Sequence, residues 1–332
     1  MSKRLAAVLV ALITFASSLA RAEDKPTVIG IPGIPPVFSG LQVVVADKEG
    51  FFKKYGVDVH VRSFDTGVAA ARAVVSGEID MSVSPTPPIV NMVANANVPI
   101  VGIYGMEHPD WFVGSVDPAI KGCKDLAEQG VGVDTPGGAR ATALRQMTAG
   151  CIPFDSMKLI ALSSNVGAAM IAGQLKAGVL HIDDIPVIEE QTHKPLTIVV
   201  RLKTVKPISE YNFYPVRKDR LAQTRERFVR VLAGLIDASN FMYEPKNLDR
   251  VAEIATVTGR TKAQAKSAVE KFLEIEFWPH GNDGLGEKNV EAEIETQAKV
   301  GGIRPGKTPP TYAQLVDRSV WQDANALVKS KR

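Results

Sequence analysis

The sequence predicts an α/β protein of two similar lobes, each a mainly parallel sheet flanked by helices, followed by a helical C-terminal third. Three observations favour this fold class. Apolar β-branched runs alternate with helix-length runs from Thr27 to Val200, which is typical of parallel βαβ units. Segments of the first third recur about 100 residues later. From Asp219 onward, apolar residues recur at helical spacing instead.

The N-terminus has the composition of a secretory signal peptide. Lys3 and Arg4 precede an apolar run over 5–19, and Ala20-Arg21-Ala22 is a small-x-small cleavage site. We therefore predict a signal peptide over 1–22, a mature chain that begins near Glu23, and a periplasmic location of the Gram-negative type. The remainder, about 310 residues, is long enough for two hydrophobic cores.

The charge balance argues against nucleic-acid binding. The full chain has 39 Lys and Arg against 36 Asp and Glu. Three of the basic residues, Lys3, Arg4 and Arg21, leave with the signal peptide, and 39 less three equals the 36 acidic residues. A mature chain of zero net charge has no basic field to attract a polyanion.

The two cysteines, Cys123 and Cys151, are expected to form a disulfide. Export places them in an oxidising compartment. A strand over 130–134 followed by a helix over 139–149 would return Cys151 to the end of the lobe that holds Cys123. Two buried thiols are the alternative. The five His residues are scattered, so neither a metal site nor a cofactor is predicted.

In the first third, strands and helices alternate between turns rich in Pro and Gly. The predicted strands are 27–31, 57–63, 79–84 and 100–104, and the predicted helices are 41–52, 68–75 and 89–96. The second third repeats this alternation. Its predicted strands are 131–134, 158–162, one about Leu180 and 197–200, and its predicted helices are 139–149 and 166–177.

The C-terminal third is predicted to be helical scaffold without binding chemistry. Thr261 and Gln264 have the spacing of a capping box. Apolar residues at helical spacing mark the buried faces of three further segments: Leu221, Phe228, Leu232 and Leu235; Val290 and Ile294; and Leu315, Val316, Val320 and Trp321.

Two lobes of similar sequence would form a cleft. Residues 27–33 align with 131–137, and 73–77 align with 174–178. Ligands of open α/β sheets bind beyond the carboxyl ends of the strands, so the space between the lobes is the expected binding site. Its floor would hold Pro32-Gly33 and Pro136-Gly137.

The turn over 135–138 is a candidate anion site. It leads into the helix over 139–149, where free backbone N–H groups and the helix dipole favour a negative group. Arg140 in the first helical turn opposes the dipole unless an anion lies nearby. The alternative is an ordinary strand-to-helix turn.

Four ordered segments, 46–59, 63–83, 124–139 and 168–178, resemble the periplasmic substrate-binding proteins of nitrate/sulfonate/taurine-type ABC transporters, which also include thiamine-precursor binders. The resemblance implies a type II-like periplasmic-binding-protein fold. It also implies a first lobe over 23–110 and 217–332 and a second over 111–216, with crossings near 110–115 and 211–216.

The resemblance also implies which loops line the ligand. Together with the residues argued above, they give this predicted set: Gly33, Ile34, Pro35, Phe38, Phe64, Thr66, Ser84, Thr86, Glu107, Thr135, Gly137, Gly138, Ala139, Arg140 and Asp183. The chain departs from the family at His181, where an Asp is usual, and at Asp183-Asp184. These carboxylates either face the ligand or cap the helix that follows.

The leading hypothesis is a monomeric receptor that closes on a small, anionic solute and delivers it to an inner-membrane ABC permease with its ATPase. One alternative is a binder of a thiamine-precursor pyrimidine or other N-heterocycle. Others are a ligand-presenting sensor module and an enzyme of the pyrimidine-synthase type. The enzyme hypothesis lacks its cysteine-rich iron motif, and GxSxG, HExxH and CxxC motifs are absent from the sequence.

Overall fold

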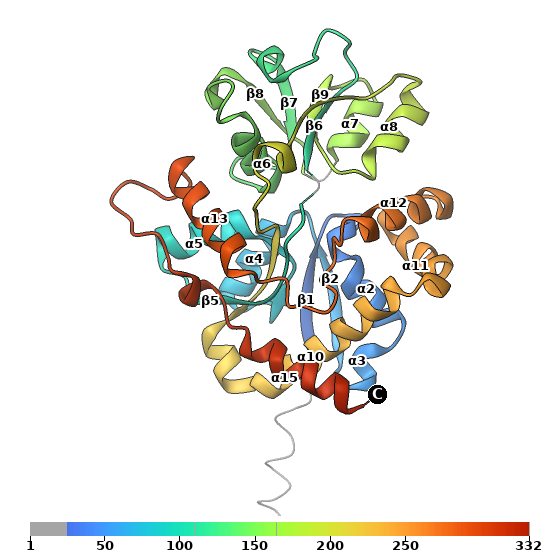
Figure 1. The fold of residues 1–332 in the computed structure, drawn as a ribbon, viewed down its shortest axis with the longest axis vertical. Coiled ribbons are helices and arrows are strands. Elements are labelled where there is room, and N and C mark those ends of the chain that lie inside the picture. Colours follow the sequence, from blue (N-terminus) through green and yellow to red (C-terminus); the bar gives the residue numbers. More distant parts are fainter. Residues whose placement is uncertain (1–24, 110, 164, 332) are drawn as a thin grey trace, which may run out of the picture.

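The computed structural model describes residues 25–109, 111–163 and 165–331. It contains two sheets, one above the other, each flanked by helices (Figure 1). We call the six-stranded sheet with its helices the first lobe and the five-stranded sheet with its helices the second lobe. The predicted α/β fold class is confirmed. The predicted signal peptide over 1–22 and the start near Glu23 lie outside the described residues.

The first sheet consists of β1 (Thr27–Pro32), β2 (Val59–Phe64), β3 (Met81–Ser82), β4 (Ser84–Pro85), β5 (Ile100–Met106) and β11 (Asn212–Arg217). Its order is β2-β1-β3-β11-β4, and β5 also pairs with β11. β1 is parallel to β2 and β3, as the βαβ pattern predicts. β11 is antiparallel to its three neighbours, because the chain enters this sheet again from the second lobe.

The second sheet consists of β6 (Phe112–Ser115), β7 (Gly130–Val133), β8 (Lys158–Ala161), β9 (Ala177–Leu180) and β10 (Thr197–Arg201), in the order β10-β6-β9-β7-β8. β7 is parallel to β8 and β9, whereas β6 is antiparallel to β9 and β10. The chain therefore crosses between the sheets after β5 and again after β10. The exact boundaries of the two lobes stay a prediction, and β11 belongs to the first sheet.

The helices that flank the first sheet are α2 (Leu41–Lys48), α3 (Phe51–Lys54), α4 (Gly67–Ser76) and α5 (Thr86–Ala96), with a 3₁₀ turn at Phe38–Gly40. The predicted single helix over 41–52 is wrong. Gly50 adopts φ 73° between α2 and α3, a left-handed conformation that ends one helix and redirects the next.

The second lobe contains α6 (Ala139–Thr148), α7 (Val166–Ile171), α8 (Asp184–Thr192) and α9 (Leu202–Val205), with 3₁₀ turns at Cys123–Leu126 and Phe154–Ser156. The predicted helix over 166–177 is too long. Gly173 adopts φ 73° just after α7, and Ala177 already pairs with Ser115 in the sheet.

The C-terminal third contains α10 (Lys218–Tyr243), α11 (Leu248–Ala255), α12 (Lys262–Glu274), α13 (Glu287–Lys299), α14 (Tyr312–Leu315) and α15 (Ser319–Ser330), with 3₁₀ turns at Pro245–Asn247 and Thr256–Thr258. The predicted apolar face of α10 is buried, and α10 packs against α2, α3 and α15. The capping box of Thr261 and Gln264 is confirmed by reciprocal hydrogen bonds of 3.1 and 3.3 Å. Within the described residues, no helix is long and apolar enough to span a membrane.

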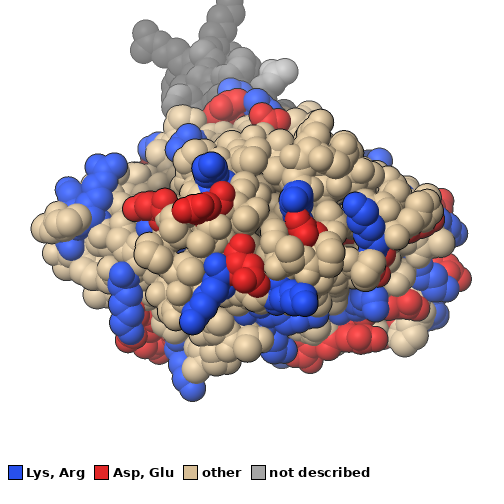
Figure 2. All heavy atoms as spheres, turned by 90° about the horizontal axis from the view of Figure 1, so that it is seen from above, with Lys and Arg blue, Asp and Glu red and all other residues tan. Residues whose placement is uncertain are grey.

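Charged side chains of both signs are interspersed on the face seen from above (Figure 2). Opposite charges also form ion pairs on the surface, such as Arg62 with Glu78 at 2.6 Å. Such exposed pairs contribute little to stability. On this face, the distribution agrees with the balanced composition of the chain.

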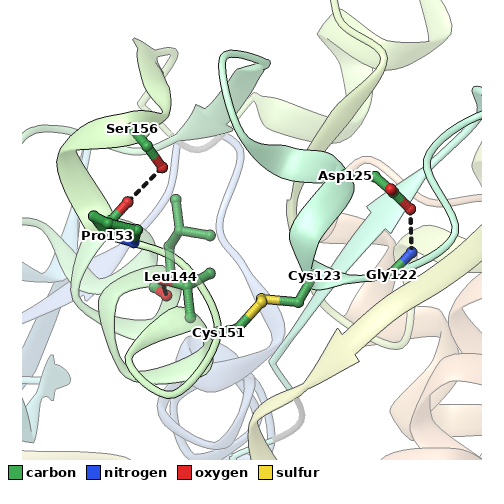
Figure 3. Close-up of a disulfide and its surroundings, with 8 residues drawn as sticks. Gly122, Cys123, Asp125, Leu144, Cys151, Pro153 and Ser156 are labelled. Atoms are coloured by element: carbon green, nitrogen blue, oxygen red, sulfur yellow. Dashed lines mark hydrogen bonds between the residues drawn. A yellow bond between two sulfur atoms is a disulfide. The ribbon is translucent and has the colours of Figure 1, made fainter.

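Cys123 and Cys151 form the predicted disulfide (Figure 3). Cys123 opens a 3₁₀ turn, and Cys151 follows the C-terminus of α6, whose Leu144 packs nearby in the same view. Their Cα atoms are 6.3 Å apart. The path up β7 and down α6 returns the chain to Cys123, as the sequence predicts, so the crosslink ties two elements of the second lobe.

Candidate functional site

The larger of two adjacent cavities between the lobes has a volume of about 250 Å³. The first lobe contributes the loop after β1 and the turn before α12, and the second lobe contributes the starts of α6, α7 and α8. Its lining residues are Pro35, Pro36, Val37, Phe38, Arg140, Asn165, Gly167, Ala168, His181, Asp183, Asp184, Thr258, Gly259 and Arg260.

A smaller cavity of about 30 Å³ adjoins it, since Val37, Arg140 and His181 line both. The remaining lining residues come from strand ends of both sheets and from the crossing segments: Pro32, Ser39, Thr66, Gly67, Pro85, Trp111, Asp134, Ala139, Tyr211 and Asn212. The two cavities form one site at the carboxyl ends of β1 and β7, where open α/β sheets bind ligands.

Arg140 is a buried cation at the centre of this site. It lies in the first turn of α6 and is only 6% exposed. Its Nε donates to the backbone oxygen of Val179 at 3.1 Å, and its guanidinium lies 5.2 Å from the ring centroid of Trp111. No carboxylate of the described residues forms an ion pair with it. Within the described residues, the site therefore holds a positive charge without a paired carboxylate.

The N-terminus of α6 is already capped by Asp134, a residue that the sequence analysis did not select. The backbone N–H of Ala141 donates to Asp134 Oδ1 at 3.3 Å, and that of Gly138 donates to Thr135 O at 2.8 Å. The expectation of free N–H groups at this turn is therefore wrong at these two positions. A Cβ at Gly138 would lie 2.4 Å from Asp134 Oδ1, so the carboxyl group occupies the space that a side chain would fill.

Asp183 and Asp184 both line the larger cavity, but each is paired. The Nη2 of Arg260 lies 2.7 Å from Asp183 Oδ2 and 2.6 Å from Asp184 Oδ1. Neither is a simple helix cap, although Asp184 also accepts from the backbone N–H of His181. Burial, with the charge of Asp184, raises the pKa of Asp183 to about 6 despite the opposing charge of Arg260.

His181 belongs to an aromatic wall with Trp111 and Tyr211. The ring centroids of His181 and Trp111 are 3.9 Å apart, and the Tyr211 hydroxyl lies 3.3 Å from His181 Nε2. Burial lowers the pKa of His181 to about 3, and the charge of Arg140 acts in the same direction, so the imidazole is neutral at pH 7. Its buried Nδ1 has no hydrogen-bond partner among the described residues.

Residues 38–247 match the protein-family model described as NMT1/THI5 like. The chain belongs to this family. The match extends from the loop after β1 through both sheets and into the C-terminal helices, so it includes most of the residues that line the two cavities. No curated protein sequence matches the NMT1/THI5-like chain.

Solved structures similar to this NMT1/THI5-like chain share its fold at low sequence identity. The periplasmic nitrate-binding protein NrtA from Synechocystis PCC 6803 is 13% identical, with a TM-score of 0.75 over 92% of this chain and 89% of that one. The alkanesulfonate-binding protein SsuA from Xanthomonas axonopodis pv. citri is 14% identical, with a TM-score of 0.68 over 90% and 98%. The predicted resemblance to binding proteins of nitrate and sulfonate ABC importers is confirmed.

One structural neighbour is an enzyme. The desulfurization enzyme DSZB is 13% identical to this chain, with a TM-score of 0.60 over 93% of this chain and 100% of that one. The fold is therefore shared by binding proteins and by at least one catalyst. The family supports a solute-binding role for the chain, and the fold alone does not separate binding from catalysis.

The structure brings six of the predicted site residues to the two cavities. Pro35, Phe38, Arg140 and Asp183 line the larger one, and Thr66, Ala139 and again Arg140 line the smaller one. Arg140 is thus the predicted residue common to both. Whether these side chains contact a ligand stays a prediction.

The other predicted residues have different surroundings. Among them, Ile34 is 57% exposed, Ser84 donates to Gly67 O at 2.8 Å, and Glu107 accepts from the backbone N–H of Gly286 at 2.8 Å. Phe64 packs against an apolar cluster of the first lobe, and Thr86 is buried. Of the remaining turn residues, Gly33 and Gly137 adopt positive φ, Thr135 is partly buried and Gly138 lies against Asp134.

Thr258, Gly259 and Arg260 were missed, because the C-terminal third was expected to be scaffold only. That expectation is corrected by their place in the wall of the larger cavity. Asp134 could have been found from its position, since a carboxylate directly after a buried strand lies at the carboxyl edge of the sheet. Arg260 follows no such local pattern.

Proposed function

We propose that this chain is an exported solute-binding protein that encloses a small anionic solute between its lobes and delivers it to an ABC importer. The observation that supports the anion most directly is Arg140. A buried guanidinium without a carboxylate partner is unfavourable, because desolvation of a charge costs several kcal/mol unless an opposite charge compensates. An anionic ligand would supply that charge.

His181 adds a second donor. The Tyr211 hydroxyl can donate to Nε2, and this assignment leaves the proton of the neutral imidazole on Nδ1. An unpaired Nδ1–H in the wall of both cavities suits an oxyanion. Arg140 and His181 would then hold the same acidic group.

The volume of the site favours a small solute. Cavities that hold drug-sized ligands measure roughly 300–1,000 Å³. The larger cavity, at about 250 Å³, is smaller than the lower end of this range. Peptides and polymers are therefore poor candidates.

A binder of an N-heterocycle is the second candidate, and the aromatic wall of Trp111, His181 and Tyr211 supports it. A cationic heterocycle would need a carboxylate partner from the protein. Asp183 and Asp184 already pair with Arg260. The anion is therefore the stronger proposal.

Closure of the lobes is the proposed mechanism. Both lobes contribute lining residues, so a ligand makes its full set of contacts only when the lobes are together. The ligand therefore stabilises the closed form by the difference between its binding free energies for the closed and the open form. The predicted leader at 1–22 and the similarity to periplasmic binding proteins support a periplasmic monomer whose partners are an inner-membrane permease and its ATPase. We propose no catalytic role.

Calorimetry on Arg140→Ala tests the anion proposal. Mass spectrometry of protein purified without unfolding first identifies a retained solute, which is then titrated into both proteins. A charged hydrogen bond contributes about 1.5–3 kcal/mol, so the affinity is expected to fall roughly 10- to 150-fold. Arg145→Ala is the matched control, because Arg145 lies on the same helix over the Phe154 ring and lines neither cavity. Unchanged affinity in Arg140→Ala would exclude the proposal.

A further inference from the structure

The wall of the smaller cavity contains two groups of opposite charge, the carboxyl group of Asp134 and the guanidinium of Arg140. Asp134 is 3% exposed and lines this cavity together with Arg140, His181 and Tyr211. The two charged groups do not form an ion pair with each other. Arg140 is held by Val179 O and the Trp111 ring, whereas Asp134 is held at the helix start by Ala141 N–H.

Asp134 retains unused hydrogen-bond capacity. An ionised carboxylate offers about four acceptor sites and no donor. Among the described residues, one side-chain hydrogen bond to Asp134 is found, from Ala141. The hydrogen bonds found for the side chain of Arg260 go to Asp183 and Asp184, and none goes to Asp134 among the described residues. Within the described residues, the other acceptor sites of Asp134 have no side-chain partner, and Asp134 lines the cavity.

Gly138 leaves room for the carboxyl group of Asp134 beside the helix start. Its absent Cβ would lie 2.4–2.5 Å from the carboxyl atoms of Asp134, closer than real Cβ contacts come. The glycine therefore gives Asp134 room beside the helix start, next to the cavity. A negatively charged ligand without any hydrogen-bond donor would be repelled by this carboxylate.

We infer that Asp134 is a specificity-determining residue, and that the ligand is an acid that also carries an N–H or O–H donor. Arg140 and His181 take the acidic group, and Asp134 accepts the hydrogen bond from the amino, amide or hydroxyl group. The inference rests on the proposed function and narrows its substrate class. Oxyanions that lack a donor are disfavoured. Arg140 attracts them, but Asp134 repels them, and they have no N–H or O–H group to donate to its carboxylate.

Binding of matched acids to the wild-type protein tests the inference. The probes are propanoate, 3-hydroxypropanoate and 3-aminopropanoate, and benzoate, 3-hydroxybenzoate and 3-aminobenzoate, each titrated by calorimetry after removal of any retained solute. In at least one series, the acid with a donor is expected to bind about tenfold or more tightly than its parent, as a charge-assisted hydrogen bond predicts. Parents that bind as tightly as their substituted acids overturn the inference.

Asp134→Asn provides the matched variant. Asparagine keeps the shape and an oxygen acceptor for Ala141 N–H, so helix α6 stays capped, whereas its NH₂ group donates where the carboxylate accepts. The preference for substituted acids is expected to disappear and the parent acids to gain affinity. A variant that retains the wild-type preference overturns the inference.

The two proposals fail differently. If the retained solute binds Arg140→Ala as tightly as it binds the wild type, the proposed anion-binding function is contradicted. If none of the six acids binds the wild type, the inference about Asp134 is overturned. If the acids bind and Arg140→Ala weakens them without any difference between substituted and parent acids, the anion site stands and the role of Asp134 is refuted.

Discussion

Glu210 is a buried carboxyl group whose charge state controls local stability. It is 2% exposed, and neither carboxyl oxygen has a hydrogen-bond partner of normal geometry among the described residues. Burial raises its pKa well above the ordinary 4.5, and the nearby charges of Glu107, Glu293 and Asp283 act in the same direction. The folded protein therefore keeps a proton that the unfolded chain loses above about pH 4.5.

From this follows a prediction for Glu210→Gln. A raised pKa in the folded state gives stability that is present below pH 4.5 and is lost as the pH rises toward the folded-state value. The wild type is expected to lose about 1.4 kcal/mol of unfolding free energy per pH unit from this group. The neutral amide removes that slope.

Urea unfolding of the wild type and of Glu210→Gln between pH 5 and 8 measures how the free energy of unfolding changes with pH. Glu295→Gln on the exposed side of α13 is the control and is expected to keep the wild-type slope. If Glu210→Gln keeps it too, Glu210 is already charged in the folded protein.

Among elements, α6 is held at both ends, by Asp134 at its start and by the disulfide just after its end. In the chain-entropy model, closing the segment between Cys123 and Cys151, which are 28 residues apart, stabilises the fold by about 3–4 kcal/mol.

The double variant Cys123→Ser and Cys151→Ser is therefore expected to unfold with about 3–4 kcal/mol less free energy than the wild type. Neither cysteine lines a cavity, so the solute affinity of the folded variant is expected to stay the same. Wild type unfolded in the presence of a reductant should match the variant. Equal stability of variant and oxidised wild type would contradict this account.

Elements with a strong local signal could be predicted from the sequence, and those defined by tertiary pairing could not. The predicted helix over 68–75 agrees with α4 within one residue at each end, because Thr66 caps α4 and Gly77 ends it. β6 and β11 were missed, since their strand character comes from pairing across the chain crossings. At the site, Arg140 was predicted from its conflict with the helix dipole, whereas Arg260 depends on a contact between distant segments.

In the whole molecule, Arg260 links the lobes. It precedes α12 in the first lobe, and its carboxylate partners Asp183 and Asp184 lie at the start of α8 in the second. If the lobes separate, these ion pairs break. The pairs therefore contribute to the closed form as well as to the wall of the cavity.

We expect Arg260→Gln to favour the open form. Removing one partner of a buried ion pair costs about 3–5 kcal/mol, and the partly exposed Arg260 belongs at the low end of this range. Small-angle scattering of the ligand-free protein should give a larger radius of gyration than for wild type. Arg250→Gln is the control, because its partners Glu49 and Glu253 lie in the same lobe. An unchanged radius in Arg260→Gln would show that other contacts set the closure.

The position of β11 has a consequence for the order in which the chain acquires its structure. β11 lies between β3 and β4 and also pairs with β5, so the first sheet needs a strand that is synthesised after the whole second lobe. The earlier strands wait more than 100 residues for this partner, and such distant pairings slow folding. The first sheet can therefore be completed only after Arg217 is available, whereas every strand of the second sheet precedes β11 in the chain.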